Sequence, residues 1–169
     1  CLYDGCTDSL ALNYDPTANN DDGSCTYSCV YQGFGGELSI DMHDSFGDGW
    51  NGASLYIINS VGDTVNTGGS TVPFGNDASE SLCIPTGCFE VSVTQGFWPG
   101  EVSWELVLDG DTLLSAAVPN GAPFSGLLEV GVGGCNLGCT DTSAQNYNPS
   151  AVTDNGSCMY SCTETVYML

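Results

Sequence analysis

The feature that most constrains the fold of this chain is a cysteine-rich segment that occurs twice. Residues 5–29, GCTDSLALNYDPTANNDDGSCTYSC, return without a gap at 138–162 as GCTDTSAQNYNPSAVTDNGSCMYSC. Most retained positions are Cys, Gly, Pro, Asn, Asp, Ser and Tyr, and the majority of these types fix turns and loops rather than a packed core. Such self-similarity predicts a repeat architecture in which a small module alternates with a larger domain.

The repeat divides the chain into four regions. Residues 1–29 form a cysteine-rich Asp/Asn module, 30–134 a larger domain, 135–162 the second module, and 163–169 a tail. Cys1 stands five residues before Cys6, and Cys135 stands four before Cys139. We therefore interpret Cys1 as the counterpart of Cys135, and the chain as one period of an array.

The charge of the chain is unusually one-sided. It holds no Lys or Arg against 21 Asp and Glu, which gives a formal net charge of -21. Nucleic acids and anionic membranes are excluded as partners, because binding to both relies on basic residues. Clustered carboxylates must be neutralised by metal cations, spaced into water or left to repel one another, and calcium is the expected cofactor. No apolar run approaches the roughly 18 residues of a membrane span, so membrane insertion is not expected.

Ten cysteines and a single histidine favour disulfides over zinc sites. Disulfides indicate an oxidising compartment, and we expect a secreted or cell-surface protein. Spacing favours the pairs Cys6–Cys25 and Cys139–Cys158, while the short turn IPTG favours Cys83–Cys88. The remaining cysteines are assigned to outer rings, although four cysteines allow three pairings and the rings could cross module borders: Cys1, Cys29, Cys135 and Cys162.

Oxygen-bearing side chains recur at matched positions of the two modules. A calcium shell tolerates Asp-to-Asn exchange because both residues offer a hard oxygen. The alternative is that Asp and Asn simply build the turns of a loop. The calcium hypothesis names Asp8, Asn13, Asp15, Asp21 and Asp22, with Asp141, Asn146, Asn148, Asp154 and Asn155 in the second copy.

This motif resembles the GCTD...NY(D/N)P...D(D/N)GSC repeat of large secreted proteins from aquatic bacteria and protists. Such proteins are often surface, adhesive or fibrous. The resemblance covers about 50 residues of the chain. It implies an extracellular tandem architecture and carries no activity with it.

The larger domain alternates apolar and polar residues in short runs separated by Gly- or Pro-containing turns. This pattern predicts an all-β, antiparallel β-sandwich of jelly-roll or immunoglobulin-like kind. Hairpin turns are expected at 109–111 and 60–62. The expected strands are 37–43, 53–59, 63–67, 79–84, 88–94, 102–108, 111–118 and 126–132.

The segment 44–52, DSFGDGWNG, predicts a second calcium site. Asp44, Asp48 and Asn51 offer oxygens at short spacing, and three glycines permit tight backbone turns. The alternative is a Gly-rich turn that folds Trp50 onto the sandwich edge. Together with LCIPTGCFEV and GEVSWEL, the segment resembles a β-rich extracellular domain that accompanies the GCTD repeat. The resemblance covers roughly 100 residues and implies that Glu101, in its third motif, completes the site.

Three function classes compete for this chain. Catalysis is not expected, because His43 is the only imidazole and no acidic pair is singled out. A calcium-dependent carbohydrate-binding module is the alternative, with Trp98 in a loop where it can stack on a sugar. The leading hypothesis is a structural repeat unit of an extracellular filament, stalk or adhesin, whose partners are copies of itself.

The last residues complete this hypothesis. The tail 163–169, TETVYML, is rich in β-formers and would be an aggregation hazard if exposed. We expect it to complete a neighbouring or following sandwich by strand donation, which produces head-to-tail contacts. Asn155, in Asn-Gly-Ser, is the one N-glycosylation sequon.

Overall fold

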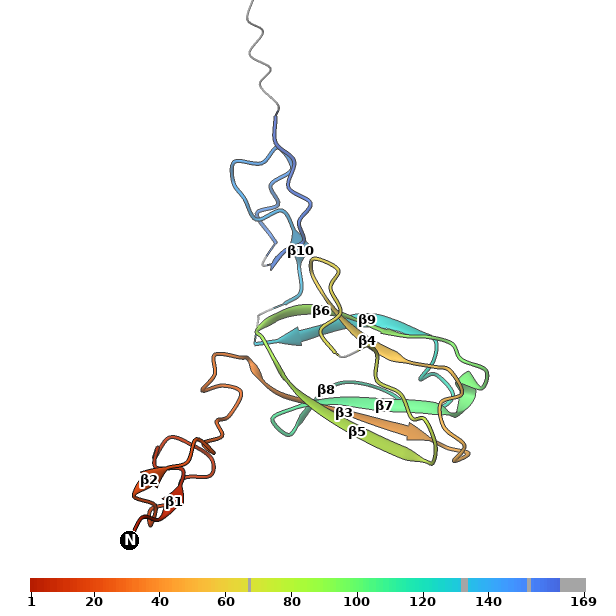
Figure 1. Cartoon of the computed structure of the whole chain (residues 1–169). Coiled ribbons are helices and arrows are strands. Elements are labelled where there is room, and N and C mark those ends of the chain that lie inside the picture. The colour runs from red at the N-terminus through yellow and green to blue at the C-terminus, as the bar shows by residue number, and fades with distance from the viewer. Residues whose placement is uncertain (67, 132–133, 152, 162–169) are drawn as a thin grey trace, which may run out of the picture.

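A computed structural model describes residues 1–66, 68–131, 134–151 and 153–161. It has the expected all-β architecture, an antiparallel β-sandwich flanked by two small disulfide-stapled modules (Figure 1). Within the described residues, no helix has the length and hydropathy needed to cross a membrane.

The sandwich consists of two antiparallel sheets. One has the order β5 (Asp77–Ile84), β3 (Gly36–Asp44), β7 (Val102–Leu108) and β8 (Asp111–Ala116). The other has the order β4 (Leu55–Asn59), β6 (Gly87–Val93) and β9 (Phe124–Val130). Alternate residues of each strand face inward, as in β3, where Leu38, Ile40 and Met42 are fully buried. The two inner faces form one apolar core.

Seven of the eight expected strands form, and the prediction of a strand at 63–67 is wrong for its described residues. In its place, Ile58 and Thr64 make an isolated bridge. The buried Asn66 side chain replaces the strand ladder: its Oδ1 accepts from the Ile57 amide at 2.9 Å, and its Nδ2 donates to the Leu55 carbonyl at 2.9 Å. A side-chain amide can satisfy a backbone edge in this way without a continuing strand.

The hairpin turn at 109–111 is confirmed, whereas residues 60–62 form a turn that leads to an isolated bridge rather than to a second strand. Asp109 and Gly110 join β7 to β8 with φ values of 49° and 97°, the left-handed conformation that a two-residue hairpin needs. After β4, the Gly62 amide donates to the Asn59 carbonyl at 3.0 Å. Both turns lie at places where Gly tolerates positive φ.

The disulfides correct part of the predicted pairing. Cys6–Cys25 and Cys139–Cys158 form as expected. Cys83–Cys88 does not form, and neither does an outer ring joining Cys1 to Cys29. Instead Cys29 pairs with Cys83, and Cys88 pairs with Cys135. Cys1 is free and exposed, whereas Cys162 lies outside the described residues.

The reason for the error is that the IPTG turn connects two different sheets. Ile84, the first residue of this turn and the last of β5, faces the core, so Cys83 points to the outer face of the first sheet. Cys88 alternates with the inward Phe89 and points to the outer face of the second sheet. Packed sheets lie about 10 Å apart, so two cysteines on opposite outer faces cannot bond.

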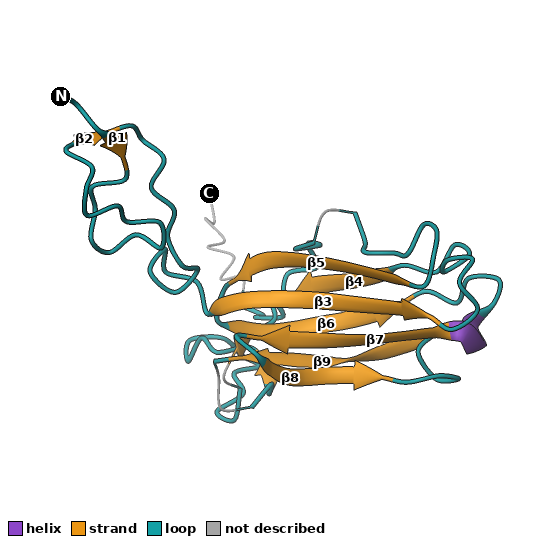
Figure 2. Ribbon diagram, turned by 90° about the horizontal axis from the view of Figure 1, so that it is seen from below, coloured by secondary structure: helices purple, strands orange, loops and turns teal. Residues whose placement is uncertain are grey.

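Both small modules attach at one end of the sandwich. The first contains β1 (Asp4–Gly5) paired with β2 (Asn20–Asp21), and the second contains β10 (Leu137–Gly138) paired with β11 (Thr153–Asp154). The single 3-10 helix, η1 (Pro99–Glu101), lies at the opposite end among the loops that follow β3 and β6 (Figure 2). We call this opposite end, formed by residues 44–52 and 96–101, the tip.

Candidate metal centre

Asp44 ends β3 and turns its carboxylate into the tip. Its side chain is only 2% exposed. Oδ2 accepts backbone N–H bonds from Gly47 at 2.6 Å and Gly49 at 2.9 Å. Oδ1 is buried and has no hydrogen-bond partner. A buried carboxylate oxygen without a donor is costly, so this oxygen is available to a cation.

The loop after Asp44 is held in one conformation by its glycines and its tryptophan. Gly49 has φ of 93°, and a Cβ there would lie 2.7 Å from the Val72 carbonyl oxygen. The Trp50 side chain is buried, and its Nε1 donates to the His43 carbonyl at 2.9 Å. The same contacts that fold Trp50 onto the sandwich therefore fix the backbone between Asp44 and Asp48.

Two further carboxylates approach from neighbouring positions. Asp48 lies in the same loop, and Glu101 ends η1 in the connection from β6 to β7. The Ser45 amide donates to the Glu101 carbonyl at 3.0 Å, which ties the two loops together. Asp44, Asp48 and Glu101 each offer an oxygen within 4.8 Å of the others. Residues more than 50 positions apart in the chain thus share one site.

The electrostatics of this cluster favour a cation. Burial raises the pKa of the Glu101 carboxyl, and the neighbouring Asp48 and Asp44 raise it further. Glu101 Oε2 is a second buried oxygen without a hydrogen-bond partner. Because the chain has no Lys or Arg, only a proton or a metal ion can neutralise these charges. Three hard oxygen donors, with carbonyls nearby, suit Ca²⁺, whose identity here stays a prediction.

Asn51 contacts the cluster through its amide nitrogen, and its predicted role as a metal ligand through Oδ1 stays a prediction. Its Nδ2 donates to Asp48 Oδ1 and to the Gly49 carbonyl, both at 2.8 Å. The amide therefore holds the Asp48 carboxylate in position. Glu101 does lie beside Asp44 and Asp48, as the resemblance implied.

In the first module, the predicted ligands serve as turn residues. Asp8, Asp15, Asp21 and Asp22 each accept a backbone N–H two residues ahead, at 2.8–2.9 Å. Asn13 bridges the chain by donating to the Ser24 carbonyl and accepting from the Thr26 amide. These bonds account for the conserved oxygens without a metal.

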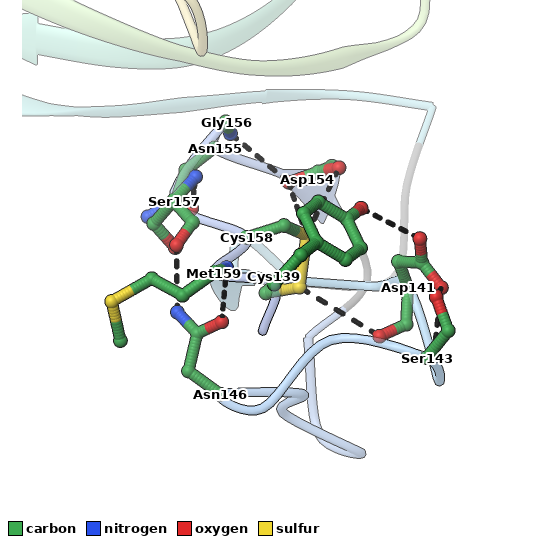
Figure 3. The surroundings of a disulfide bond; sticks show 11 residues. Cys139, Asp141, Ser143, Asn146, Asp154, Asn155, Gly156, Ser157, Cys158 and Met159 are labelled. Atoms are coloured by element: carbon green, nitrogen blue, oxygen red, sulfur yellow. Dashed lines mark hydrogen bonds between the residues drawn. A yellow bond between two sulfur atoms is a disulfide. The ribbon is translucent and has the colours of Figure 1, made fainter. Parts of the chain in front are cut away.

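The second module repeats this network around Cys139–Cys158 (Figure 3). Asp141, Asn148, Asp154 and Asn155 accept the same kind of backbone bond, at 2.8–3.1 Å. Asn146 donates to the Ser157 carbonyl. Across the described ranges, the only grouping of three metal-ligating acidic, His or Cys side chains is that of the tip. Calcium in the modules stays a prediction, and the turn alternative explains the geometry.

His43, the only histidine of the chain, lies on β3. Its Nδ1 lies 2.6 Å from Asp77 Oδ1 on the outer face of the first sheet. Ser103 is its register partner on β7, so the three residues form a cross-strand row. No hydrogen bond joins the Ser103 hydroxyl to the imidazole, and the strand amides beside it belong to the β-ladder.

The pocket beside the acidic cluster contains an aromatic residue, Phe46, that the sequence analysis did not single out. A cavity of about 250 Å³ is lined by Phe46, Asp48, Trp98 and Glu101. Phe46 is 72% exposed and Trp98 is 61% exposed. The sequence places the aromatic residue Phe46 between Asp44 and Asp48, but it does not tell whether the ring is buried in the core. Its exposure in the structure identifies it as a surface residue.

The remaining predictions concern the glycosylation sequon and the tail. Asn155 is exposed, and its Oδ1 accepts from the Ser157 amide at 3.1 Å. Its glycosylation stays a prediction. The tail 163–169 lies outside the described residues, as does Cys162.

Comparison with known proteins gives only short similarities. A stretch of 24 residues is 75% identical to ribulose bisphosphate carboxylase/oxygenase activase of Spinacia oleracea, covering 14% of this chain and 5% of that protein. The activase 1 of Larrea tridentata is 71% identical over 24 residues, again 14% of this chain and 5% of the relative. Activase A of Hordeum vulgare is 68% identical over 25 residues, which is 15% and 5% of the two chains.

The chain thus spans about 5% of the length of these curated relatives. No protein-family model matches the sequence. No solved structure matches it either. Neither the fold nor the metal centre inherits a function from these similarities.

Proposed function

We propose that this chain is a structural repeat unit of an extracellular filament, stalk or adhesin, stabilised by disulfides and calcium and assembled head to tail. One observation carries the proposal: the small modules are disulfide-bonded to the sandwich as well as within themselves. A module that merely linked two domains would need no such bonds.

The two bonds to the sandwich use different sides of the module. At the end of the first module, Cys29 bonds to Cys83 of the sandwich that follows it. At the start of the second module, Cys135 bonds to Cys88 of the sandwich that precedes it. Each module position thus has one cysteine for the preceding sandwich and one for the following sandwich. In an array, every module would be clamped to both neighbours.

Cys1 fits this scheme. It is the sequence counterpart of Cys135, and it is free and exposed in the structure. The partner that the scheme gives it is the Cys88 position of another sandwich. A chain clamped in this way resists bending between its domains, because each module joins its sandwich through both the backbone and a disulfide. Such a repeat suits a filament or stalk.

A protein of two units tests the clamp. In it, residues 1–134 are followed directly by residues 1–169, so that the second Cys1 occupies the position of Cys135. Peptide mapping without reduction is expected to recover this Cys1 bonded to Cys88 of the first unit. A free thiol at both positions, after oxidative refolding that forms Cys6–Cys25, would refute the clamp.

Electron microscopy tests the assembly itself. We expect linear filaments in the presence of calcium, and monomers after deletion of residues 163–169, since the tail is expected to complete a neighbouring sandwich. The matched control is a shuffled tail of the same composition. Filaments of unchanged length after the deletion would contradict strand donation. A full-length protein that stays monomeric would contradict assembly of this chain by non-covalent contacts.

The second candidate function is calcium-dependent carbohydrate binding. The observation that favours it is the pocket at the tip, where two exposed aromatic side chains flank two of the three clustered carboxylates. This function does not exclude the first, because the tip lies at the end of the sandwich away from both modules (Figure 2).

A further inference from the structure

We infer that the tip is a cation-dependent binding site for a neutral sugar residue, in which vicinal hydroxyl groups complete the coordination of the metal and Phe46 and Trp98 contact the apolar face of the ring. This deepens the carbohydrate-binding candidate and rests on the metal centre, but it does not require filament assembly.

The first step is that two of the three clustered carboxylates line the pocket, whereas the third is buried behind them in the chain's tip. Asp44 approaches from the buried end of β3, and its unpartnered Oδ1 makes it the inner ligand. Asp48 and Glu101 belong both to the acidic cluster and to the wall of the pocket. A cation held by the three therefore faces the pocket. Calcium takes 6–8 oxygen ligands, so positions remain for water or a ligand.

The second step is the chemistry of the pocket wall. Phe46 and Trp98 stand on opposite loops, after β3 and before η1, and both are largely exposed. Aromatic rings beside hydroxyl-binding groups suit a ligand with one apolar face and one polar edge. A pyranose ring has this character, because its C–H groups gather on a face and its hydroxyls on the edge.

The third step is charge. Three carboxylates and one divalent cation leave the site with a net negative charge, and the chain as a whole carries a formal charge of -21 with no Lys or Arg. A uronic or sialic acid would be repelled by this field. The ligand class is therefore a neutral saccharide that offers two adjacent hydroxyl oxygens.

The fourth step is size. The pocket of about 250 Å³ lies below the about 300–1,000 Å³ of sites that enclose drug-sized ligands. It suits one sugar residue, such as the end or a branch of a glycan, rather than a buried long chain. A tip that points away from the modules leaves the rest of such a glycan in solvent (Figure 2).

The test is titration of the full chain with soluble mannan, dextran and galactan, in Ca²⁺ and in EDTA, with polygalacturonate as the anionic probe. Trp50 and Trp104 are buried, so a change in tryptophan fluorescence reports on Trp98. We expect binding of at least one neutral glycan in Ca²⁺, its loss in EDTA, and no binding of polygalacturonate.

Two variants assign the binding to this pocket. Trp98→Ala removes the fluorescent reporter, so its binding is measured by isothermal titration calorimetry, and we expect glycan binding to weaken by about tenfold or more. Its matched control is Phe97→Ala, which removes an adjacent side chain that is 84% exposed and does not line the pocket. Asp44→Asn is expected to abolish both Ca²⁺-induced stabilisation and glycan binding. Melting curves establish that each variant is folded.

Several outcomes would overturn the inference. A chain that binds Ca²⁺ but none of the neutral glycans leaves the metal centre standing and removes the sugar site. Glycan binding that survives EDTA or Trp98→Ala places it elsewhere. Calcium-dependent self-association that Asp44→Asn abolishes, without glycan binding, assigns the tip to contact between copies. Filaments are scored separately by microscopy, so the two proposals can fail independently.

Discussion

The small modules and the sandwich are stabilised in opposite ways. The first module buries almost nothing: Leu10, Leu12 and Tyr14 are exposed, and only Cys6, Ala11 and Cys29 reach the buried class. Its shape comes from one internal disulfide and from side-chain oxygens bonded to backbone amides. The sandwich instead has a continuous core of aliphatic and aromatic side chains between two sheets.

The comparison explains why the two module copies share so many identical residues. A turn that depends on a particular Asp, Asn, Gly or Cys accepts few replacements, so the two module copies keep the same letters. A core accepts many apolar side chains of suitable size. The fold of the module therefore depends on the identity of individual residues. The fold of the sandwich depends on the alternation of apolar and polar residues.

The largest expected effect comes from removing a core aromatic of the sandwich. Trp104 is 1% exposed, packs edge-on against Phe124 with ring centroids 4.9 Å apart, and donates to the Gly121 carbonyl at 2.8 Å. Trp104→Ala should lower the free energy of unfolding of the sandwich by about 3–5 kcal/mol. Denaturant unfolding followed by circular dichroism measures this.

The modules should be insensitive to that change. Disulfide mapping of the Trp104→Ala variant is expected to recover Cys6–Cys25 unaltered, since this bond lies wholly within residues 1–29. Scrambling of Cys6 or Cys25 would show that the first module depends on the sandwich for its fold, against the contrast described above. Trp98→Ala, at an exposed position, serves as the control for loss of a tryptophan.

The second effect is the converse. Replacing both Cys6 and Cys25 by Ser removes a bond that closes a loop of about 20 residues, worth about 3 kcal/mol in the chain-entropy model. The first module has too little core to fold without it. Cleavage by chymotrypsin between residues 10 and 14 should become fast, while the melting temperature of the sandwich stays within error. Equal resistance of variant and wild type would mean that hydrogen bonds alone hold the module.

The third effect concerns the melting temperature of Asp44→Asn, a change that removes a charge at the tip while nearly preserving the size of the side chain. Without cation, Asp44→Asn should raise the melting temperature, because it removes one of three repelling carboxylates and an Asn can donate to Asp48 or Glu101. With Ca²⁺ the wild type should have the higher melting temperature of the two. Ca²⁺ at about 100 times its Kd adds about 2.7 kcal/mol to the free energy of unfolding of the wild type alone. Identical wild-type melting curves in Ca²⁺ and EDTA would refute the metal site.

The pH dependence at the tip has a definite sign. The pKa of Glu101 is raised in the folded state, chiefly by burial and then by Asp48 and Asp44. The folded protein therefore binds this proton more tightly than the unfolded chain. Without cation, the contribution of Glu101 to stability is present below its unfolded pKa and is lost as pH rises through its folded pKa. Bound Ca²⁺ should suppress this loss.

The smallest effect concerns polar bonds of the first module. The Tyr27 hydroxyl donates to Asp8 Oδ2 at 2.8 Å, and this bond raises the pKa of Tyr27 above its usual 10.0. Its stabilising effect should persist below that value and disappear as pH rises through the folded pKa. Tyr27→Phe should abolish this alkaline step, as seen by tyrosinate absorbance. Tyr160, which makes the same bond to Asp141 at 2.6 Å, provides the internal control.

Acid acts on the other partner of this bond. The pKa of Asp8 is lowered, first by the Leu10 amide and then by the Tyr27 hydroxyl. The contribution of Asp8 to the stability of the module is present above the pKa of Asp8 in the unfolded chain. It is lost as the pH falls through the pKa of Asp8 in the folded protein. Because both groups are only half-buried and this is a single polar bond, we expect a small shift in protease resistance rather than unfolding.

Local sequence determined much of this protein. Period-two alternation gave correct positions for seven strands, since each strand must turn one face to the core. The repeat identified both modules, and spacing identified Cys6–Cys25 and Cys139–Cys158 because those bonds close short loops. The absence of Lys and Arg pointed to cations wherever carboxylates gather. All these features depend on neighbours in the chain.

Only the tertiary structure shows the features that depend on residues far apart in the sequence. The IPTG turn connects the two sheets, so Cys83 and Cys88 lie on opposite outer faces of the sandwich. Cys83 therefore bonds to Cys29, and Cys88 bonds to Cys135. The tertiary structure selected, from 21 acidic residues, the three whose oxygens converge at the tip. It also let the Asn66 side chain take the place of a strand. Sequence spacing does not report which sheet a strand joins, and in a β-sandwich that choice brings distant residues together.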